Sequence, residues 1–371
     1  MDNQRLLESF TNLVKIDSPS RGEGKIAAYL GNELESMGFS VSFDGSSSVT
    51  GSDTGNLIAR LSGTAPGIVA LTAHMDSVEP CCGIEPVVED GVIRSAGETI
   101  LAADDKAGIA AILEAVQSVR EEGVPYPDIL VIFTTCEELS LLGAKALPEG
   151  TFAEGTPCFV LDAGGAPGTI VMKAPSHYIF RAAFTGRAAH AGVEPEAGLS
   201  AIQMAAWAIS HMELGRLDEA TTANVGMIEG GTAFNVVPDQ CLVSGECRSF
   251  YADRLLACKA RITEALEAGA SQFAGSVETS WELDYPEVTY DEDDPLVARL
   301  SEVARSIGLA ANLTVSGGGA DTNVFAKQGA KAITLGIGMS AFHSKSEYIA
   351  LKDLEDSARL VEATIASFVK G

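Results

Sequence analysis

Acidic and imidazole side chains stand at the ends of several apolar, strand-like stretches of this sequence. The run 128–135 leads directly into the adjacent carboxylates Glu137 and Glu138, and the run 67–73 leads into His74. Two neighbouring carboxylates at the end of a buried strand raise each other's pKa unless a cation lies close to them. Imidazole and carboxylate together suit Zn²⁺, Co²⁺ or Mn²⁺ better than Mg²⁺ or Ca²⁺. These residue types therefore predict a metal site.

Three further stretches supply candidate ligands of the same kinds. Asp104 and Asp105 begin a helical stretch, Asp162 ends another strand-like run, and His343 follows the last apolar run. Because ligands collect outside the carboxyl ends of the strands in an open α/β sheet, we expect these side chains to converge there. Simpler interpretations remain open at this stage: the two aspartates could cap the helix, and the other residues could be ordinary polar groups of solvated turns.

The stretches that carry these residues alternate between strand-like and helical patterns, which predicts a mostly parallel α/β sheet. After residue 175 the pattern changes to strand, helix, two strands, helix and strand, the βαββαβ order of a ferredoxin-like α+β domain. We therefore predict a split α/β domain over 1–175 and 289–371, with a second domain inserted at 176–288. In the split domain, helices are expected near 3–15, 25–37, 105–122 and 295–307, and strands near 41–43, 56–61, 67–73, 128–135, 158–162 and 332–338.

The composition excludes several classes of function. With 371 residues, of which 46% are hydrophobic, the chain is long enough for two packed domains. Its formal net charge of −26 repels nucleic acid and anionic membranes, so neither is an expected partner. No apolar run approaches the roughly 20 residues of a membrane span, and the seven cysteines follow no disulfide or zinc-knuckle spacing. We predict a cytoplasmic protein with reduced thiols.

Seven short motifs span nearly the whole chain: TAHMDSV, LAADDKAG, TTCEELSLLGA, VLDAGG, AAHAG, NVGMIEGGTAFNVVPDQC and AFHSKSEYI. Together and in this order they resemble the M20 family of metallopeptidases, most closely its peptidase T (tripeptide aminopeptidase) branch. The resemblance implies a zinc-exopeptidase catalytic domain that binds two Zn²⁺ ions, with Co²⁺ or Mn²⁺ as substitutes. It also implies that the inserted domain is a lid through which two copies form a homodimer.

The resemblance implies a role for each candidate ligand. Asp104 would bridge both metals, His74 and Asp162 would complete one site, and Glu138 and His343 would complete the other. The three carboxylates and a bridging hydroxide would balance the four positive charges of two divalent ions. The peptide bond after the bridging aspartate is expected to be cis, as it often is in the family.

Other matched residues would handle protons and substrate. Glu137 matches the general base, which takes a proton from the metal-activated water and delivers it to the leaving amine. Asp76 would accept the other ring N–H of the first histidine and fix its tautomer. His190 matches a lid histidine that stabilises the oxyanion from the partner subunit. Asn235 and Arg248 match lid positions that hold the substrate backbone and its terminal carboxylate.

Three functions remain to be separated. We expect hydrolysis of the N-terminal peptide bond of short peptides, with tripeptides as the favoured length. The alternative is a related M20 amidohydrolase, either a carboxypeptidase or an N-acyl amino acid deacylase, with the same metal site. A non-enzymatic binding protein is the third, and the intact Glu137 argues against it. His190 is also consistent with a surface loop histidine, and Arg248 with a structural ion pair.

Overall fold

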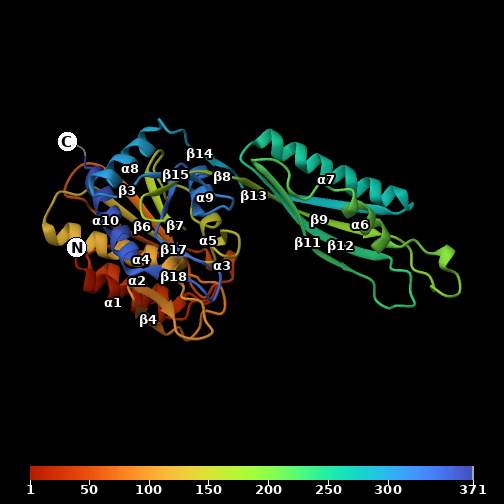
Figure 1. The fold of residues 1–371 in the computed structure, drawn as a ribbon, viewed down its shortest axis with the longest axis horizontal. Coiled ribbons are helices and arrows are strands. Elements are labelled where there is room, and N and C mark those ends of the chain that lie inside the picture. Colours follow the sequence, from red (N-terminus) through yellow and green to blue (C-terminus); the bar gives the residue numbers. More distant parts are fainter. Residues whose placement is uncertain (370–371) are drawn as a thin grey trace. The chain divides into compact units, whose positions relative to one another are not determined.

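The chain divides into two compact units in this computed structural model, which describes residues 1–369 (Figure 1). Unit 1 contains Met1–Lys173, Tyr290–Ser316 and the chain from Ala320 onward. Unit 2 contains Ala174–Thr289 together with Gly317–Gly319. Unit 1 is therefore discontinuous in sequence, whereas unit 2 is formed almost entirely by one continuous segment.

The main sheet of unit 1 has the strand order β1-β2-β6-β3-β7-β16-β8, and β15 also pairs with β8. Its central strands β6, β3, β7 and β16 run parallel to their neighbours within this group. The predicted mostly parallel α/β sheet is thus confirmed. The strands are β1 (Ser40–Phe43), β2 (Leu57–Leu61), β3 (Ile68–His74), β6 (Asp128–Thr134), β7 (Pro157–Ala163), β8 (Thr169–Ala174), β15 (Asn312–Val315) and β16 (Lys331–Gly336).

Helices bury the apolar central strands of this sheet. Six consecutive residues of β3 are buried, as expected for a strand with both faces covered. The helices α1, α4 and α10 pack on one another, and α4 contacts β3 and β7. The helices of unit 1 are α1 (Asn3–Val14), α2 (Gly24–Ser36), α3 (Ser47–Thr50), α4 (Ala103–Glu122), α5 (Leu142–Lys145), α8 (Pro295–Ser306), α9 (Asp321–Lys327) and α10 (Leu351–Ser367).

One glycine lets α4 approach the sheet closely. A Cβ atom on Gly108 would lie 2.4 Å from the carbonyl oxygen of Leu161 in β7 and 2.4 Å from Oδ1 of Asp105. Such distances are sterically forbidden, so the close packing of the start of α4 on β7 requires glycine here. This packing brings the aspartates at the start of α4 next to Asp162 of β7.

A small second sheet of unit 1 was not predicted from the sequence. Its strand order is β17-β18-β5-β4, and all its pairs are antiparallel. The strands are β4 (Pro86–Glu89), β5 (Val92–Ser95), β17 (Met339–Ser340) and β18 (Tyr348–Ala350). Strands of two to four residues offer too few positions for an alternating pattern to be recognised. This sheet supports the segment that carries His343, which lies between β17 and β18.

Unit 2 is an antiparallel sheet with two helices on one face (Figure 1). Its strand order is β10-β11-β12-β9-β13, and its four long strands have the order and connections of a ferredoxin-like βαββαβ domain. The elements are β9 (Ser176–Thr185), η1 (Pro195–Ala197), α6 (Ala201–Ser210), β10 (Gly215–Arg216), β11 (Thr221–Gly230), β12 (Gln240–Ser249), α7 (Ala252–Gln272), β13 (Ser276–Tyr285) and β14 (Val288–Thr289). Among the helices of residues 1–369, none has the length and apolar character needed to cross a bilayer.

Candidate active site

The five predicted metal ligands come from distant segments of unit 1 and lie together in the structure. His74 is the last residue of β3, Asp162 lies at the end of β7, and Asp104 lies at the start of α4. Glu138 follows β6, and His343 lies in the loop between β17 and β18. Because β3, β6 and β7 are parallel, their carboxyl ends share one edge of the sheet, where the polar side chains gather.

Asp104 lies between the two histidines and turns one carboxylate oxygen toward each. Its Oδ1 is 2.9 Å from Nε2 of His74, and its Oδ2 is 3.2 Å from Nε2 of His343. On the first side, Nε2 of His74 is also 3.8 Å from Oδ1 of Asp162. On the second side, Nε2 of His343 is 3.0 Å from Oε1 of Glu138. The five side chains thus form two groups of three that share Asp104.

The donor atoms of these groups fit divalent cations. Ligand atoms about 2.0–2.2 Å from a tetrahedral zinc ion lie roughly 3.3–3.6 Å from one another, and the distances in both groups are close to this range. Ligand atoms of His74, Asp104 and Glu138 all lie within 4.8 Å of each other, as do those of His74, Asp105 and Asp162. Within residues 1–369, Oδ1 of Asp105 is also a buried oxygen without a hydrogen-bond partner.

The electrostatic field of the cluster favours positive charge. Hydrogen bonds with Asp104 and Glu138 raise the pKa of His343 to about 10. Burial raises the pKa of Asp162 well above its usual value, and the nearby charge of Asp104 raises it further. Crowded carboxylates in a dry environment are stabilised by any cation that enters. The arrangement therefore favours the binding of a cation.

Asp76 organises both the first histidine and the adjacent glutamates. Nδ1 of His74 lies 3.0 Å from the backbone carbonyl oxygen of Asp76 and 3.5 Å from its carboxylate Oδ1, so Nε2 is the nitrogen that faces the acids. The carboxylate of Asp76 accepts hydrogen bonds from the backbone N–H of Glu137 at 3.0 Å and of Glu138 at 3.3 Å, and from Oγ of Ser20 at 2.7 Å. One buried carboxylate therefore fixes the backbone of both glutamates.

Glu137 lies beside the metal-ligand cluster and is 9% exposed. Burial raises the pKa of its carboxyl group well above the usual value, and the negative charge of Asp162 raises it further. A carboxylate that holds a proton more firmly than usual is suited to accept one from water. The neighbouring Glu138 contacts His343, with Oε1 3.0 Å from Nε2.

Asp105 does not cap the helix, which the sequence had left open. Its Oδ2 accepts a hydrogen bond from the backbone N–H of His74 at 3.2 Å, so it links the start of α4 to the end of β3. The Asp104–Asp105 peptide bond is cis, as expected from the family resemblance. The adjacent Lys106 is also buried, and its Nζ donates to the carbonyl oxygen of Met75 at 3.0 Å and to Oγ of Ser77 at 2.6 Å.

Comparisons with known proteins agree with this geometry. Residues 70–367 match peptidase family M20/M25/M40. The uncharacterized protein YqjE of Bacillus subtilis (strain 168) is 40% identical over 371 residues, which cover both chains completely. The chain belongs to the M20 peptidase family. It is therefore a hydrolase of the metallopeptidase class.

Two solved structures resemble this M20 peptidase along its entire length. Aminopeptidase PepT from Bacillus cereus ATCC 10987 is 38% identical, with a TM-score of 0.92 and complete coverage of both chains. A tripeptidase from Staphylococcus aureus subsp. aureus Mu50 is 36% identical, with a TM-score of 0.94 and complete coverage of both chains. The recognition of an M20, peptidase T-like chain from its motifs is confirmed.

Glu347 is a site residue that the sequence analysis of this M20 peptidase missed. Its buried carboxylate accepts hydrogen bonds from the backbone N–H of Ala102 at 2.7 Å and of Asp104 at 3.0 Å. Ala102 adopts a left-handed conformation, with φ at 61°, so the chain turns sharply just before Asp104. Glu347 was part of the motif AFHSKSEYI, but nothing in its spacing indicated that it binds backbone groups.

Replacing Glu347 by glutamine is expected to weaken metal binding about ten- to a hundredfold, the range typical of residues that orient metal ligands. The amide presents an N–H₂ group to one of the two backbone donors, so the turn before Asp104 loses a partner. The dissociation constant for zinc can be measured by competition with a chromophoric chelator. Glu98→Gln is the control, because Glu98 is exposed and accepts from Lys345 of the same region at 2.6 Å. Unchanged zinc affinity in Glu347→Gln would contradict this role.

The three predicted lid residues lie in unit 2, in two separate places. His190 forms an isolated β-bridge with Val236, and the N–H of Ala191 donates to the carbonyl oxygen of Asn235 at 3.0 Å. These two contacts place His190 and Asn235 on adjacent loops, and both residues are exposed. Arg248 lies near the other end of β12. Gln240 begins β12 on the side of Asn235, and in an extended strand it lies about 26 Å from Arg248.

Arg248 is held by a polar network within unit 2. Its Nε and Nη2 donate to Oε2 of Glu246 at 3.3 and 2.8 Å, and its Nη1 donates to the hydroxyl of Tyr285 at 3.1 Å. The same Glu246 oxygen is 2.7 Å from Nε2 of His177, whose Nδ1 is 3.0 Å from Oδ2 of Asp284. Arg248 is thus an ion-pair former, as the simpler interpretation held, and its side chain is 26% exposed to solvent.

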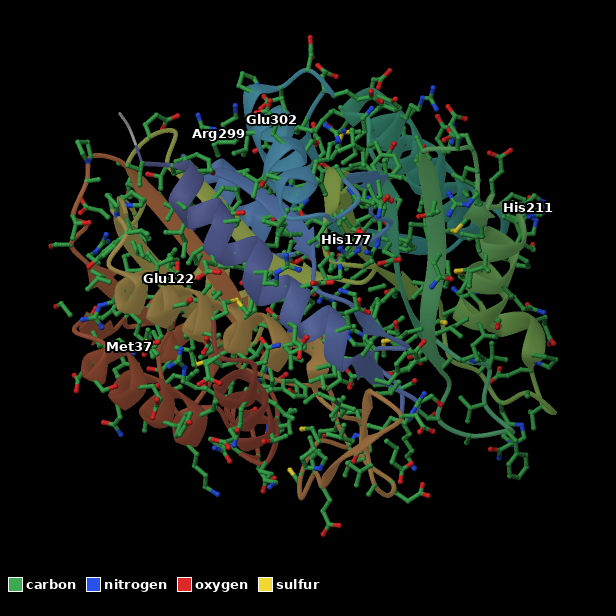
Figure 2. The ribbon with its side chains drawn as sticks, turned by 60° about the vertical axis from the view of Figure 1, so that its left-hand side comes forward. Met37, Glu122, His177, His211, Arg299 and Glu302 are labelled. Atoms are coloured by element: carbon green, nitrogen blue, oxygen red, sulfur yellow. The ribbon has the colours of Figure 1, made fainter. Side chains whose placement is uncertain are left out.

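The two histidines of unit 2 labelled in Figure 2 differ in their surroundings. His177 is buried, whereas His211 is exposed and stacks on Trp207 with ring centroids 3.7 Å apart. Burial alone would lower the pKa of His177, but its hydrogen bonds with Asp284 and Glu246 outweigh burial and raise the pKa. The hydrogen bond from His177 in turn lowers the pKa of Glu246 to about 2.

We expect unit 2 to be most stable between about pH 4.5 and 6.5. The contribution of His177 is complete below its unfolded pKa of about 6.5 and is lost as the pH rises through its raised folded pKa. The contribution of Glu246 is present above about pH 4.5 and is lost as the pH falls toward 2. Urea unfolding can be followed by tryptophan fluorescence at each pH, because both tryptophans, Trp207 and Trp281, lie in unit 2.

The histidine variants provide the control for this pH dependence. In His177→Gln, the loss of stability above pH 6.5 should largely disappear, since the titrating group is gone. In His211→Gln the wild-type slope should persist, because His211 is exposed. If the stability of His177→Gln still falls as the pH rises above 6.5, another group causes that loss.

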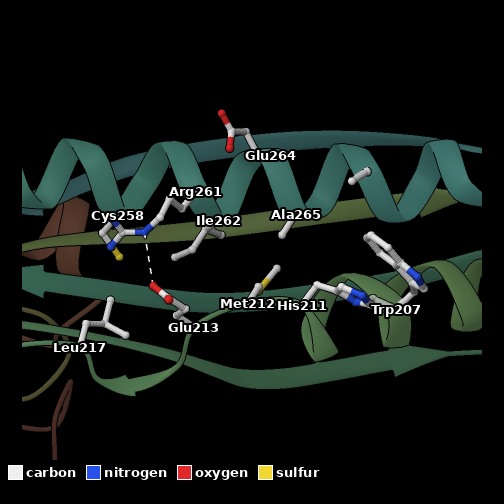
Figure 3. A pocket seen from close by; sticks show the side chains of 11 residues that line it. Trp207, His211, Met212, Glu213, Leu217, Cys258, Arg261, Ile262, Glu264 and Ala265 are labelled. Atoms are coloured by element: carbon white, nitrogen blue, oxygen red, sulfur yellow. Dashed lines mark hydrogen bonds and ion pairs between the residues drawn. The ribbon is translucent and has the colours of Figure 1, made fainter.

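A separate pocket of about 410 Å³ lies between α6 and α7 (Figure 3). Nε of Arg261 and Oε2 of Glu213 form an ion pair of 3.7 Å at its edge. Its lining residues all belong to unit 2 and differ from the predicted site residues of this M20 peptidase. The pocket is therefore distinct from the metal-ligand cluster of unit 1.

Proposed function

We propose that this protein is a dinuclear-zinc aminopeptidase that hydrolyses the N-terminal peptide bond of short peptides, with tripeptides as preferred substrates. The observation that carries the proposal is the position of Asp104, whose two oxygens face two histidine-containing groups. The resemblance to an aminopeptidase and to a tripeptidase over the full chain supports the substrate class. Unit 1 acts as the catalytic domain, and unit 2 acts as the lid and dimerisation domain.

The proposed ligand sets follow the two groups around Asp104. His74, Asp104 and Asp162 would hold one Zn²⁺, and Asp104, Glu138 and His343 would hold the other. Co²⁺ or Mn²⁺ can take the same places, because imidazole and carboxylate ligands accept all three ions. When bound, such ions would lower the pKa of the attacking water and polarise the scissile carbonyl group.

The chain's own residues then move the proton. Glu137 accepts the proton of the attacking water on its carboxylate and donates it to the nitrogen of the leaving amine. Asp76 keeps Glu137 in place through the hydrogen bond from its backbone N–H. The burial of Glu137 excludes bulk water from this proton, so it is retained until the amine leaves.

The substrate's ends are bound by unit 2 in this proposal. Arg248 pairs with the terminal carboxylate, Asn235 with the peptide backbone, and His190 with the developing oxyanion. An extended tripeptide is only about 10 Å long, whereas His190 and Arg248 lie at opposite ends of one sheet, about 26 Å or more apart. A short peptide therefore cannot reach Arg248 together with His190 or the adjacent Asn235 of the same unit 2. This separation favours a His190, with its neighbour Asn235, supplied by a partner subunit.

A homodimer through unit 2 is proposed for the same reason. Phe234, next to Asn235, is fully exposed, and Met227 and Ile228 of β11 are also exposed. Exposed large apolar side chains are typical of protein interfaces, and those of unit 2 support one there. The partner in this proposal is a second copy of the chain, and neither nucleic acid nor a membrane is involved. A cytoplasmic location is supported by the seven cysteines, all of which are free thiols in the structure.

Mixing two inactive variants is expected to restore activity if His190 acts in the partner's site. A His190→Ala subunit supplies an intact Glu137, and a Glu137→Gln subunit supplies an intact His190. A mixed dimer therefore contains one complete site, so up to about half of the sites in such dimers recover. Turnover is measured after subunit exchange has been verified with differently tagged chains. If exchange is complete and activity stays at the level of the parents, His190 acts within its own subunit.

A substrate panel tests the proposed function directly. The zinc-loaded enzyme is assayed with di-, tri- and tetrapeptides and with the same peptides acetylated at the N-terminus. An aminopeptidase cleaves the free peptides and leaves the acetylated ones intact. Cleavage of acetylated substrates would instead support the deacylase or carboxypeptidase alternative, and no cleavage in the panel would exclude peptide hydrolysis as the function.

A further inference from the structure

His177 occupies the centre of the network that holds Arg248. It lies on β9, between β12 and β13, and it is the cross-strand partner of both Arg248 and Tyr285. Asp284 reaches its ring because β13 has an irregularity between Leu283 and Tyr285, which makes Asp284 an extra residue in the ladder. Such bulges redirect side chains, and here the bulge places a carboxylate at Nδ1 of the histidine.

Both ring nitrogens of His177 lie close to carboxylate oxygens, which favours the charged form of the ring. A neutral imidazole has one N–H donor and one acceptor nitrogen, so it can satisfy only one ionised carboxylate. Nδ1 is 3.0 Å from Asp284 and Nε2 is 2.7 Å from Glu246. Nδ1 makes a hydrogen bond with Asp284, whereas the contact of Nε2 with Glu246 is an ion pair without hydrogen-bond geometry. An imidazolium is attracted by both carboxylates, whereas a neutral ring would turn a lone pair toward one of them. His177 and Asp284 are buried, so this pair is shielded from solvent.

The charge of this imidazolium determines how much of Arg248 is available to a ligand. With His177 protonated, two cations face the two carboxylates Glu246 and Asp284, and the network is neutral. If His177 were uncharged, Arg248 would be the single cation among two acids, and an incoming carboxylate would meet net negative charge. The histidine also shares the Oε2 atom of Glu246 that accepts from Arg248, so it fixes where the guanidinium lies.

We propose that His177 is a positioning residue for substrate binding, which holds Glu246 and thereby presents a charged, correctly oriented Arg248 to the C-terminal carboxylate of the peptide. This inference rests on the proposed function and adds the origin of its carboxylate specificity. Tyr285 completes the site: its hydroxyl accepts from Nη1 of Arg248 and from the N–H of Gly319, each at 3.1 Å. With both lone pairs occupied, its own proton is left to donate to the same carboxylate.

The test compares one tripeptide with its C-terminal amide, which lacks the carboxylate. For His177→Gln we expect KM for the free acid to rise about ten- to a hundredfold, the effect of one hydrogen bond between charged groups. Its kcat, and the kcat/KM for the amide, should remain near the wild-type values. The ratio of kcat/KM for acid over amide therefore falls by the same factor. His211→Gln, at an exposed histidine of the same unit, should keep the wild-type ratio.

A double variant separates positioning from a general structural role. Arg248→Gln should abolish the preference for the acid, and adding His177→Gln to it should change the ratio no further, because both act on one interaction. Equal losses for acid and amide in His177→Gln, or a further loss in the Arg248→Gln background, would overturn the proposal.

Asp284→Asn provides a test that preserves side-chain shape. Asparagine still accepts from Nδ1 but no longer stabilises the imidazolium, whose other charged or titratable neighbours are Glu246, Arg248 and Tyr285. The acid-to-amide ratio should therefore stay near wild type at pH 5.5 and fall at pH 8, and a ratio independent of pH would overturn the proposal.

The wild-type enzyme separates a failure of this role from a failure of the proposed function. If the wild type cleaves neither substrate, both the proposed function and the role of His177 are wrong. A wild type that cleaves both, with unshifted ratios in the variants, removes only the role of His177.

Discussion

Glu137→Gln is expected to lower kcat for tripeptide hydrolysis by about 10²–10⁴-fold, the range associated with loss of a general base. Glutamine has nearly the same shape, so the hydrogen bond from the backbone N–H of residue 137 to Asp76 should persist. It cannot accept the proton of the attacking water. KM should change little, because Glu137 is placed to act on the water rather than on the bound peptide. Steady-state kinetics with the zinc-loaded enzyme measures both constants.

The neighbouring residue supplies the matched control. Glu138→Gln carries the same substitution one position later, but Glu138 lies 3.0 Å from His343 in the ligand cluster. We expect Glu138→Gln to lower zinc content by up to one ion per chain, whereas Glu137→Gln should retain the wild-type content. Elemental analysis after dialysis separates the two outcomes. Wild-type turnover in Glu137→Gln, or metal loss in both variants alike, would invalidate the assignment of the base.

Asp104→Asn is expected to affect both metal positions at once. Each oxygen of Asp104 faces a different histidine, and the amide keeps only one oxygen as a ligand. A metal ion stabilises the charge of the transition state by several kcal/mol, so its loss should lower kcat/KM by roughly 10³-fold or more. Zinc content should drop below one ion per chain. Treating the wild type with a chelator should produce a comparable loss, which added zinc reverses in the wild type and not in the variant.

Asp90→Asn controls for the loss of one carboxylate. Asp90 is exposed and has a positive φ of 51°, a conformation that asparagine tolerates, so its replacement should leave metal content and activity unchanged. If Asp104→Asn retains two zinc ions, Asp104 does not join the two groups.

The ligand cluster could be predicted from the sequence because of a topological rule. Residues at the carboxyl ends of parallel strands share one edge of the sheet, so His74 and Asp162 could be expected together without knowledge of the structure. The pairing of particular ligands, and the role of each, came from the motif resemblance. Asp105 shows the limit of local patterns: an aspartate at the start of a helix usually caps it, yet this one accepts from the N–H of His74, a contact made by tertiary packing.

The supporting residues could not be predicted, because they depend on three-dimensional contacts that leave no periodic pattern. Glu347 binds backbone N–H groups more than 240 positions earlier in the chain. Asp284 reaches His177 through a bulge in β13, and one extra residue in a strand is invisible in an alternating pattern. The helix α10 and the small sheet with β17 and β18 were likewise not expected, although they support the segment that carries His343.

The interruption of unit 1 by unit 2 has a consequence for biosynthesis. Four of the five proposed ligands have been translated once Asp162 is made, but His343 follows only about 180 residues later. At typical elongation rates of about 5–20 residues per second, the nascent chain exposes an incomplete, acid-rich cluster for roughly 10 to 40 s. Unit 2 is nearly continuous in sequence and can fold in that interval. We therefore expect a complete ligand set, and with it stable metal loading, only after His343 has been translated.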